Sequence, residues 1–527
     1  MPLKDPPRKQ TVPKPTIDWS SPGSALESLG DYIDTCSQFG DQDGTRDALN
    51  LIHEGNTQDW PANLRGRLQY FESNAWADLR DPVWDAGGNE LPWDGTEVEN
   101  QILGLRRSIL LGSQAKESPF WLPMAWTNLG NVLDHVGRPV EALEAWTGAL
   151  VIEPRHAMAR GNRGIGLANY GRNIDDSSYR ALFFAAAHQN LTEALRAQHG
   201  LEPGAQGVFT RLLESLGQSM KKSPEELLKV PELSLGDSAQ EKYYRRWCLD
   251  TRLFLNPLND IDSWTIAAKD TLTLPTLTSK DFQPEEWIAL FNQIKQEFVS
   301  ARYLVYDGLT SNEPHFSDRD VLLLNPMDYS TYSFAAEKIK VGYRMAYSVF
   351  DKIAYLLNDF LELEQPERRI SLRTVWYAEA KPAAGLHTRF RGRRNRALRG
   401  LYWLSKDLHE ERPGFRDALL PDAKELVEIR HAEHKLLRLQ DPLGIAVAAA
   451  RPFPEPTRRR RLGYSLPYDV FKLRVTRLLR TARSGIMYLT FAIGEEENVK
   501  SRTQGARAPG LPIITDVFED RWKRPPT

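Results

Sequence analysis

The sequence is poor in cysteine and in long apolar runs, and it carries almost no net charge. Its two cysteines, Cys36 and Cys248, lie far apart in the 527-residue chain and make neither a disulfide framework nor a cysteine-based metal site. No stretch approaches the ~18 apolar residues needed to cross a bilayer, and the proline-rich N-terminal segment lacks the apolar core of a signal peptide. We therefore expect a cytoplasmic protein with no membrane partner. The net charge of −2 by itself predicts no nucleic-acid partner.

Several catalytic motifs are also absent. The chain has no G-x-x-x-x-G-K-[ST] phosphate loop, no dinucleotide-binding glycine fingerprint after a strand and no G-x-S-x-G elbow. The close-set glycines of Gly161–Gly166 belong to a helical pattern. These absences argue against NTP hydrolysis, hydride transfer and serine hydrolysis, and we expect no cofactor.

What the chain does have is enough apolar residues for real cores and a helical periodicity. Its composition is 41% hydrophobic and 10% aromatic, and its length predicts two or three domains. Apolar residues recur with helical rather than alternating spacing over most of the sequence. The predicted fold class is all-α: a helical repeat array followed by an antiparallel helical bundle.

One helix–turn–helix unit has the spacing of a 34-residue tetratricopeptide repeat (TPR). Its signature positions are Trp126, Leu129, Gly130, Leu133, Gly137, Ala142, Trp146, Ala149 and Pro154. The pattern restarts 34 residues later with Asn162, Gly164, Leu167 and Gly171, and Leu64–Leu79 resembles the first helix of a degenerate unit. A lone repeat cannot bury its apolar face, so divergent neighbours are expected on both sides.

The second half of the chain predicts long helices. They are expected at Glu285–Tyr306, Tyr332–Glu362, Asn395–His409, Pro421–Gln440 and Asp469–Ala492. The aromatic segment Tyr243–Asp260 is interpreted as a docked, mainly hydrophobic connector. The predicted layout is a flexible arm (1–20), TPR-like repeats (21–200), a connector (201–265), a helical bundle (266–497) and a tail (498–527).

Five stretches in this order resemble a bacterial branch of the HEPN superfamily in which a TPR array precedes the HEPN bundle. They are YYRRWCLDTRLFLNPLND, RYLVYDGL, GYRMAYSVFDKIAYLLN, LRGLYWLSKDL and ELVEIRHAEHK. The resemblance implies a metal-independent endoribonuclease, commonly a homodimer, of the kind found in bacterial toxin and antiphage defence systems. It also implies an arginine followed by a histidine on a late helix.

The residues that match this motif are Arg430 and His434, with three residues between them instead of the family's minimum of four. Residues four apart lie on one helix face. Histidine titrates near neutrality and can move protons while the RNA 2′-hydroxyl attacks the adjacent phosphorus. Arginine is a permanent cation whose planar fork holds phosphate oxygens. The neighbouring Glu433 could orient His434 or raise its pKa.

Three alternatives remain open for this segment. Without the resemblance, Arg430 and His434 read as a solvated helix face paired with nearby glutamates. His431 could replace His434, with Lys424 as the upstream cation. His431 and His434 could also be half of a metal site, but no zinc motif surrounds them, and no metal is expected.

Two basic runs flank the candidate helix in sequence, and they predict contacts to RNA phosphates. The first is Arg389–Gly400 and the second is Arg458–Arg461. The expected RNA-binding side chains are Arg391, Arg393, Arg394, Arg396 and Lys435. The ordinary alternative is that both runs are solvated loops.

The sequence thus favours a HEPN endoribonuclease whose TPR groove holds a protein or peptide partner. Its rival is a non-catalytic scaffold that binds RNA or protein. Nucleotide sensing by the bundle is a third hypothesis without a dedicated motif.

Overall fold

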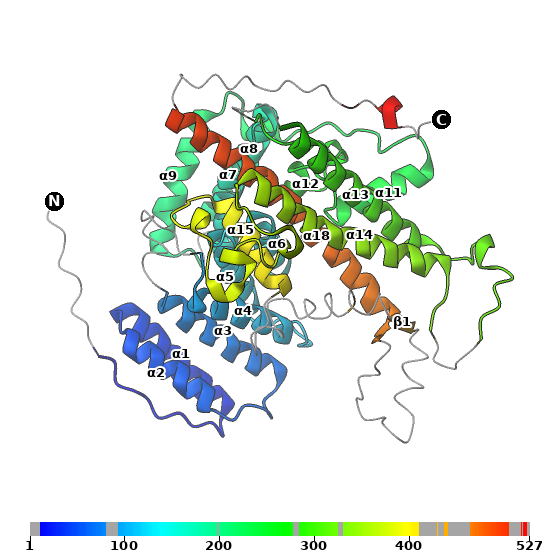
Figure 1. The fold of residues 1–527 in the computed structure, drawn as a ribbon. Coiled ribbons are helices and arrows are strands. Elements are labelled where there is room, and N and C mark those ends of the chain that lie inside the picture. The colour runs from blue at the N-terminus through cyan, green and yellow to red at the C-terminus, as the bar shows by residue number, and fades with distance from the viewer. Residues whose placement is uncertain are drawn as a thin grey trace.

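The computed structural model describes residues 11–80, 93–197, 200–277, 284–324, 330–409 and 464–504, together with short stretches at 429, 437–440, 518 and 520–523. The regular secondary structure of this part of the chain is almost entirely helical, which confirms the all-α fold class (Figure 1). None of its helices combines the length and apolarity that a membrane crossing requires.

The first half of the chain is a series of helices in which consecutive members pack as hairpins. The hairpins α3–α4, α5–α6 and α7–α8 follow one another, and we call α1–α8 the array. The bounds are α1 Pro22–Phe39, α2 Gln42–Glu54, α3 Ala62–Asp78, α4 Thr96–Gly112, α5 Leu122–His135, α6 Pro139–Ile152, α7 Ala157–Gly171 and α8 Ser177–Arg196. The connecting helices are α9 Pro203–Ser219, α10 Pro224–Leu227, α11 Ala239–Asp250 and α12 Leu258–Ile261.

Glycines set the spacing between array helices. A Cβ on Gly130 would lie 2.5 Å from the Trp146 ring, and one on Gly166 would lie 2.3 Å from the opposite side of that ring. Trp146 therefore fills the space that two glycines leave between α5, α6 and α7. Gly164, which is 34 residues after Gly130, faces Leu191 of α8 in the same way, with 2.8 Å to a built Cβ. These two glycines, 34 residues apart, are therefore each in close contact with the second helix of their own hairpin.

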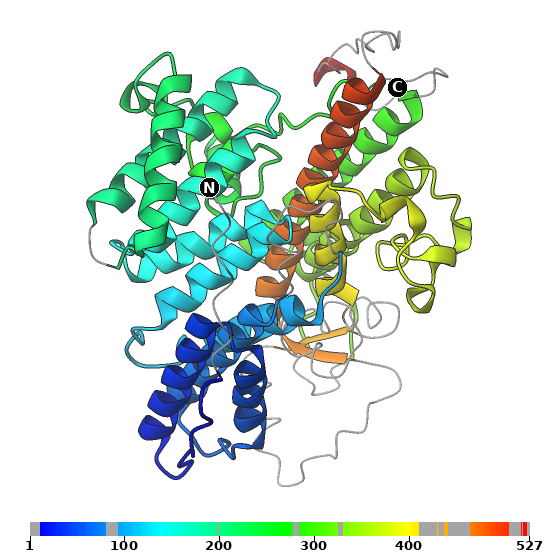
Figure 2. The same cartoon turned by 90° about the vertical axis from the view of Figure 1, so that its left-hand side faces the viewer.

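The second half is organised around α18, the longest helix. α13, α14 and α15 all pack against it. Figure 2 shows the blue-to-cyan array helices on one side of α18 and the yellow-green residues between α14 and α15 on the other. The bounds are α13 Pro284–Thr310, α14 Phe334–Phe360, α15 Arg396–His409 and α18 Tyr468–Gln504.

The predicted helix Pro421–Gln440 is wrong at its end. Leu437–Gln440 is a strand, β1, and it pairs in parallel with β2 (Tyr464–Pro467). Leu437 and Leu439 are buried and alternate with partly exposed residues, which is the two-residue period of a half-buried strand. The local sequence is compatible with either period, and pairing with β2 decides for the strand.

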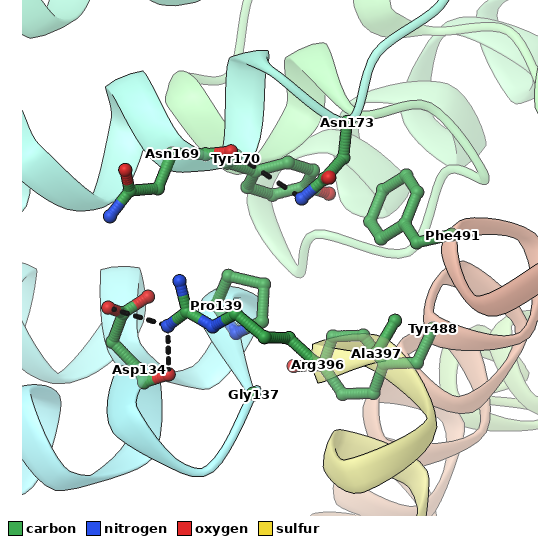
Figure 3. A pocket seen from close by; sticks show the side chains of 10 residues that line it. All are labelled: Asp134, Gly137, Pro139, Asn169, Tyr170, Asn173, Arg396, Ala397, Tyr488 and Phe491. Atoms are coloured by element: carbon green, nitrogen blue, oxygen red, sulfur yellow. Dashed lines mark hydrogen bonds and ion pairs between the residues drawn. The ribbon is translucent and has the colours of Figure 1, made fainter. Parts of the chain in front are cut away.

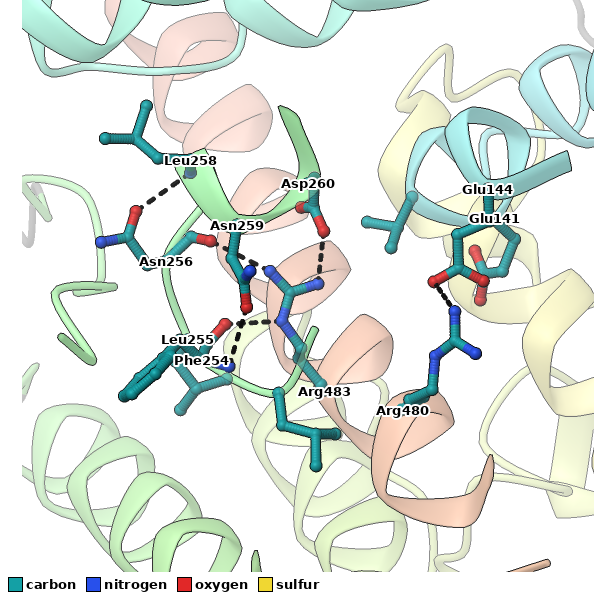
Figure 4. Close-up of polar contacts among 12 residues, drawn as sticks. Glu141, Glu144, Phe254, Leu255, Asn256, Leu258, Asn259, Asp260, Arg480 and Arg483 are labelled. Atoms are coloured by element: carbon teal, nitrogen blue, oxygen red, sulfur yellow. Dashed lines mark hydrogen bonds and ion pairs between the residues drawn. The ribbon is translucent and has the colours of Figure 1, made fainter. Parts of the chain in front are cut away.

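The segment predicted to be a docked, mainly hydrophobic connector contributes apolar residues to the core, and its backbone also holds two buried arginines. The Arg483 side chain of α18 donates to Asp260 at 2.7 Å and to the carbonyl oxygens of Phe254 and Asn256 at 2.6 and 3.0 Å (Figure 4). Arg302 of α13 forms a two-pronged pair with Asp270 at 2.9 and 2.8 Å. Buried charges of this kind persist only when they are paired and hydrogen-bonded.

Backbone contact joins the array to the bundle. Gly137, in the turn between α5 and α6, has φ +88°, and a Cβ on Gly400 of α15 would lie 2.1 Å from its carbonyl oxygen. Consequently α15 approaches the array turn so closely that neither position has space for a side chain.

Buried charges join the same two parts. Lys406 and Asp407 are consecutive on α15 and almost fully buried. Lys406 pairs with Glu99 of α4. Asp407 accepts from Arg106 at 2.9 and 3.0 Å and also pairs with Arg138. The array thus supplies opposite charges to two adjacent residues of a bundle helix.

The hydrophobic core does not stop at this joint. One cluster of buried apolar residues extends from Trp93 in the array to Ile493 in α18. A second, separate cluster extends from Ala25 to Ala75 within α1–α3. The core therefore unites most of the array with the bundle and leaves only the first helices with a core of their own.

Candidate functional site

The predicted catalytic residues Arg430, Glu433 and His434, and the predicted RNA contact Lys435, lie outside the described residues. The structure describes one residue just before this segment and a short strand just after it. Ile429 is helical and buried, and β1 begins with the buried Leu437. The chain before and after the candidate segment is therefore held in the core.

β1 is anchored at one end of the bundle (Figure 1). It pairs with β2, which leads directly into α18 at Tyr468. On its other side, the backbone N–H of Thr331 donates to Leu439 O at 2.7 Å, just before the Ser333 cap of α14. The N-termini of α14 and α18 therefore meet at β1.

Helix N-termini carry partial positive charge from their unpaired N–H groups, which favours bound anions such as phosphate. Lys338 near the start of α14 pairs with Asp307 at 2.6 Å, and Lys472 near the start of α18 pairs with Asp469 at 2.6 Å. Each of these lysines is thus paired with a carboxylate, and Arg438 is a further cation on β1 itself.

The first basic run lies elsewhere, at the start of α15. Arg393 pairs with Glu496 of α18, and Arg396 pairs with Asp134 of α5 at 3.2 Å while donating to its carbonyl oxygen at 2.8 Å. Arg391 and Arg394 are exposed. Two of the four predicted RNA-binding arginines thus form intramolecular ion pairs. The second run, Arg458–Arg461, lies outside the described residues.

A pocket lies beside the Arg396–Asp134 pair, between the array and the bundle (Figure 3). It contains about 360 Å³ of space that is partly open to solvent. Its lining residues are Asp134, Gly137, Pro139, Asn169, Tyr170, Asn173, Arg396, Ala397, Tyr488 and Phe491. Arg396 crosses the pocket to reach α5, so the site is a joint between two parts of the molecule.

The structure separates β1 from the basic run. α18 begins at Tyr468, directly after β2, and meets the basic run at Glu496. At the helical rise of about 1.5 Å per residue, these two points lie about 40 Å apart. The side chains that the sequence placed on either side of one site therefore do not converge on β1.

Sequence reasoning missed the buried charges that hold the bundle. Burial works to raise the pKa of Asp407, but the guanidinium groups of Arg106 and Arg138 outweigh it and hold the pKa below its ordinary value. The available signal was a Lys-Asp pair inside an otherwise apolar helix, LYWLSKDL. Nothing in the local sequence indicates that its partners come from residues about 300 positions earlier.

The histidine, cysteine, aspartate and glutamate side chains of the described residues bear on metal binding and thiol chemistry. Within those ranges, no three histidine, cysteine, aspartate or glutamate side chains are grouped as a metal would require. The thiol of Cys248 is buried, which raises its pKa to about 12, so this cysteine is chemically quiet.

The comparison with known families bears on the second half of the chain. No curated protein matches the sequence. Residues 278–496 match the family described as LA2681-like HEPN, a range that includes α13 to α18, β1 and the candidate Arg430–His434 segment. Residues 278–496 of this chain are a HEPN-family domain.

Proposed function

We propose that the chain is a metal-independent endoribonuclease of the HEPN type, acting in a bacterial defence or toxin system. The observation that carries the proposal is that the HEPN-family match contains the Arg430–His434 pair. Its support from the structure is positional: the flanking chain is anchored where the N-termini of α14 and α18 meet.

In the proposed reaction, the RNA supplies its own nucleophile. A base removes the proton of a 2′-hydroxyl, whose oxygen attacks the adjacent phosphorus and expels the 5′-oxygen of the next nucleotide. His434 takes up the proton of the 2′-hydroxyl and delivers a proton to the leaving 5′-oxygen, and Arg430 holds the phosphate and balances its developing charge. Glu433 stabilises the charged imidazole. The products are a 2′,3′-cyclic phosphate and a 5′-hydroxyl.

In the same proposal, the helix pairs over 21–200 are TPR-like repeats that bind a protein or peptide partner. Gly130 and Gly164, 34 residues apart and each in close contact with the second helix of its hairpin, support this assignment. The active form is a homodimer, for which the test is the molar mass in solution measured by light scattering.

The test of the reaction is RNA cleavage in the presence of EDTA, with analysis of the product ends. Arg430→Ala and His434→Ala are each expected to lower the rate by a factor of about 10²–10⁴, the range for loss of a general acid–base or charge-stabilising group. Undiminished cleavage by either variant, or cleavage abolished by EDTA, would overturn the assignment.

His431→Ala is the matched control within the same segment. It is expected to retain activity, because His431 lies on a different part of the helix surface from Arg430 in the proposed arrangement. If His431→Ala is inactive and His434→Ala is active, the alternative pairing of His431 with Lys424 replaces the first assignment.

A second candidate function is a non-catalytic scaffold. The Arg430–His434 spacing, one residue shorter than the family motif, favours it. Here the bundle binds RNA or protein without cutting, and the array does the functional work. Tight RNA binding by the wild type without cleavage of any RNA in a broad panel would select this function.

A further inference from the structure

The residues between α14 and α15 form a compact lobe without regular helices or strands. Residues 361–395, which we call the basic lobe, consist of loops and four short 3₁₀ turns. The turns are Glu367–Arg369, Ala378–Ala380, Pro382–Ala384 and Thr388–Phe390. Neither the ribonuclease proposal nor the packing of the bundle helices assigns a role to this lobe.

An aromatic core makes the basic lobe rigid. Trp376 and Phe390 are fully buried, with ring centroids 5.3 Å apart, and both contact Trp93 of the array. The backbone closes on itself, since the N–H of His387 donates to Trp376 O at 2.9 Å. A rigid platform presents its surface side chains without having to order its backbone when it binds a ligand.

The backbone of the lobe is held in costly conformations. Among the described residues, six that are not glycine have positive φ, and four of them lie in the lobe: Glu362, Glu364, Glu379 and Ala380. Such residues persist only where the surrounding contacts enforce them. The lobe therefore has a specified shape.

The lobe concentrates positive charge in a chain that has a net charge of −2. It contains eight arginines and lysines against four glutamates. The cations are Arg368, Arg369, Arg373, Lys381, Arg389, Arg391, Arg393 and Arg394. Because seven of the eight are arginine, the surface is rich in planar forks that match phosphate oxygens better than a lysine ammonium does.

Much of this charge is available to a ligand. Arg368 and Arg391 are exposed, and within the described ranges no hydrogen bond holds their guanidinium groups. Arg389 pairs with Glu362 at 2.8 Å, but both side chains are about half or more exposed, at 47% and 74%. Exposed pairs of this kind contribute little to stability, so a phosphate can displace the glutamate.

We propose that the basic lobe is a docking surface for the phosphate backbone of RNA, separate from the candidate catalytic segment. That the ligand is RNA rests on the proposed function. The lobe meets α18 at Glu496 and α14 near Tyr355, whose hydroxyl donates to Glu367 O at 3.3 Å. β1 lies near the opposite ends of both helices. The lobe therefore binds RNA at a distance from β1.

This separation sets a length for RNA that reaches both places. The lobe and β1 are about 40 Å apart along α18. A stacked strand rises about 3.4 Å per nucleotide, so about 12 nucleotides span that distance. The lobe selects for longer RNAs by adding phosphate contacts that a short fragment cannot make while it occupies the β1 end.

The experiment measures binding of a fluorescent single-stranded RNA of about 20 nucleotides to the full chain, in EDTA and over a series of salt concentrations. The lobe variant is Arg368→Gln/Arg369→Gln/Arg391→Gln. It is expected to bind about tenfold more weakly, and the slope of log Kd against log salt should fall by about 2, since each phosphate contact on a single strand contributes about 0.7.

The matched control removes the same charge elsewhere. Lys116→Gln/Arg211→Gln/Lys221→Gln replaces three exposed cations of the first half of the chain. It is expected to bind RNA as the wild type does. Circular dichroism checks that both triple variants are folded. We expect both to fold, because all six substituted side chains are exposed.

Equal affinity and equal salt slope for the lobe variant and the control variant would overturn the proposal. Binding of a fluorescent poly-glutamate peptide by a wild type that does not bind the RNA would also overturn it, since the lobe would then dock an acidic protein segment. Binding is measured without cleavage, so a lobe-dependent RNA complex that is never cut leaves the docking surface standing and removes the ribonuclease. If the wild type cleaves RNA but its lobe variant binds RNA as tightly as the control variant does, the ribonuclease stands and the docking surface is refuted.

Discussion

Single buried charges decide where the long helices of the bundle lie. Arg483 and Asp260 are each only 1% exposed, and Tyr170 of α7 donates its hydroxyl to the same Asp260 at 2.6 Å. An array helix, the connector and α18 thus meet at one carboxylate. A buried pair of this type does not stabilise a protein much relative to an apolar replacement, but removing one partner leaves an isolated buried charge.

We therefore predict that Arg483→Met lowers the free energy of unfolding by about 3–5 kcal/mol, the cost of a broken buried pair. Urea denaturation followed by circular dichroism measures it. The double variant Arg483→Met/Asp260→Asn should recover part of the loss, because the remaining polar group carries no charge.

Lys381→Gln is the control: its pair with Glu379 is exposed, so the change should be under about 1 kcal/mol. A similar loss for Arg483→Met and Lys381→Gln would contradict the role of burial.

The Glu495 carboxyl group of α18, which contacts the start of α15, makes stability depend on pH. Burial raises the pKa of Glu495 to about 7 from its ordinary 4.5, although the backbone N–H of Arg396 donates to it at 3.1 Å. Between these two pH values the folded protein binds more protons than the unfolded chain. The stabilising contribution of this group is thus complete below pH 4.5 and is lost as the pH rises towards 7.

Glu495→Gln should make the unfolding free energy fall less between pH 5 and 7 than it does in the wild type, because an amide does not titrate and can still accept from Arg396. Denaturation at several pH values measures the difference. Glu214→Gln, at an exposed position of α9, is the control and should leave the profile unchanged. Parallel profiles for wild type and Glu495→Gln would show that this carboxyl does not titrate in the range.

At the scale of elements, α15 is the helix through which the array and the bundle are joined. Its N-terminal end carries Arg396 against Asp134, its middle carries Gly400 against Gly137, and its C-terminal end carries Lys406 and Asp407. The contacts follow the whole length of the helix. Any ligand that moves α5 or its turn would therefore act on α15 directly.

Gly400→Ala tests how close this approach is. Alanine is usually better than glycine inside a helix by about 1 kcal/mol, but here its Cβ would lie 2.1 Å from Gly137 O. We expect a loss of stability large enough to lower the melting temperature by several degrees. Gly217→Ala in α9, where the nearest atom to the new Cβ is 3.9 Å away, should be neutral or stabilising. Equal effects of the two substitutions would show that α15 moves freely away from the array.

At the scale of the whole molecule, the shared core predicts that the HEPN-family domain depends on the array. The fragment 278–496 would lose Glu99, Arg106 and Arg138, and so would expose or strand Lys406 and Asp407. It would also uncover the apolar surface that packs against the array side of the continuous core.

We expect fragment 278–496 expressed alone to aggregate or to lack a cooperative unfolding transition, while the full chain unfolds its array and bundle together. Co-expression with residues 11–277 should restore soluble, folded protein, because that fragment carries the missing partners. Calorimetry and size-exclusion chromatography measure both outcomes. A stable, cooperatively folded 278–496 fragment would show that the domain is autonomous.

The sequence by itself determined the elements. Helical periodicity predicted α13 and α14 to within a few residues, and the glycine pattern placed Gly130 and Gly164 where two helices of a hairpin lie in close contact. Both are local properties: a helix depends on residues three and four apart, and a close helix hairpin depends on small residues within one repeat. The candidate Arg430–His434 pair also came from the sequence, and it stays a prediction.

Only the tertiary structure decided how the elements meet. Lys406 and Asp407 look like ordinary surface charges until Glu99 and Arg106 are placed against them. The basic run and the chain around β1 are neighbours in sequence, yet they lie at opposite ends of α18. Separation in sequence limits distance only for a few residues, whereas a rigid helix of 37 residues fixes its two ends far apart. Which charges share a site therefore depends on long-range packing that no local pattern encodes.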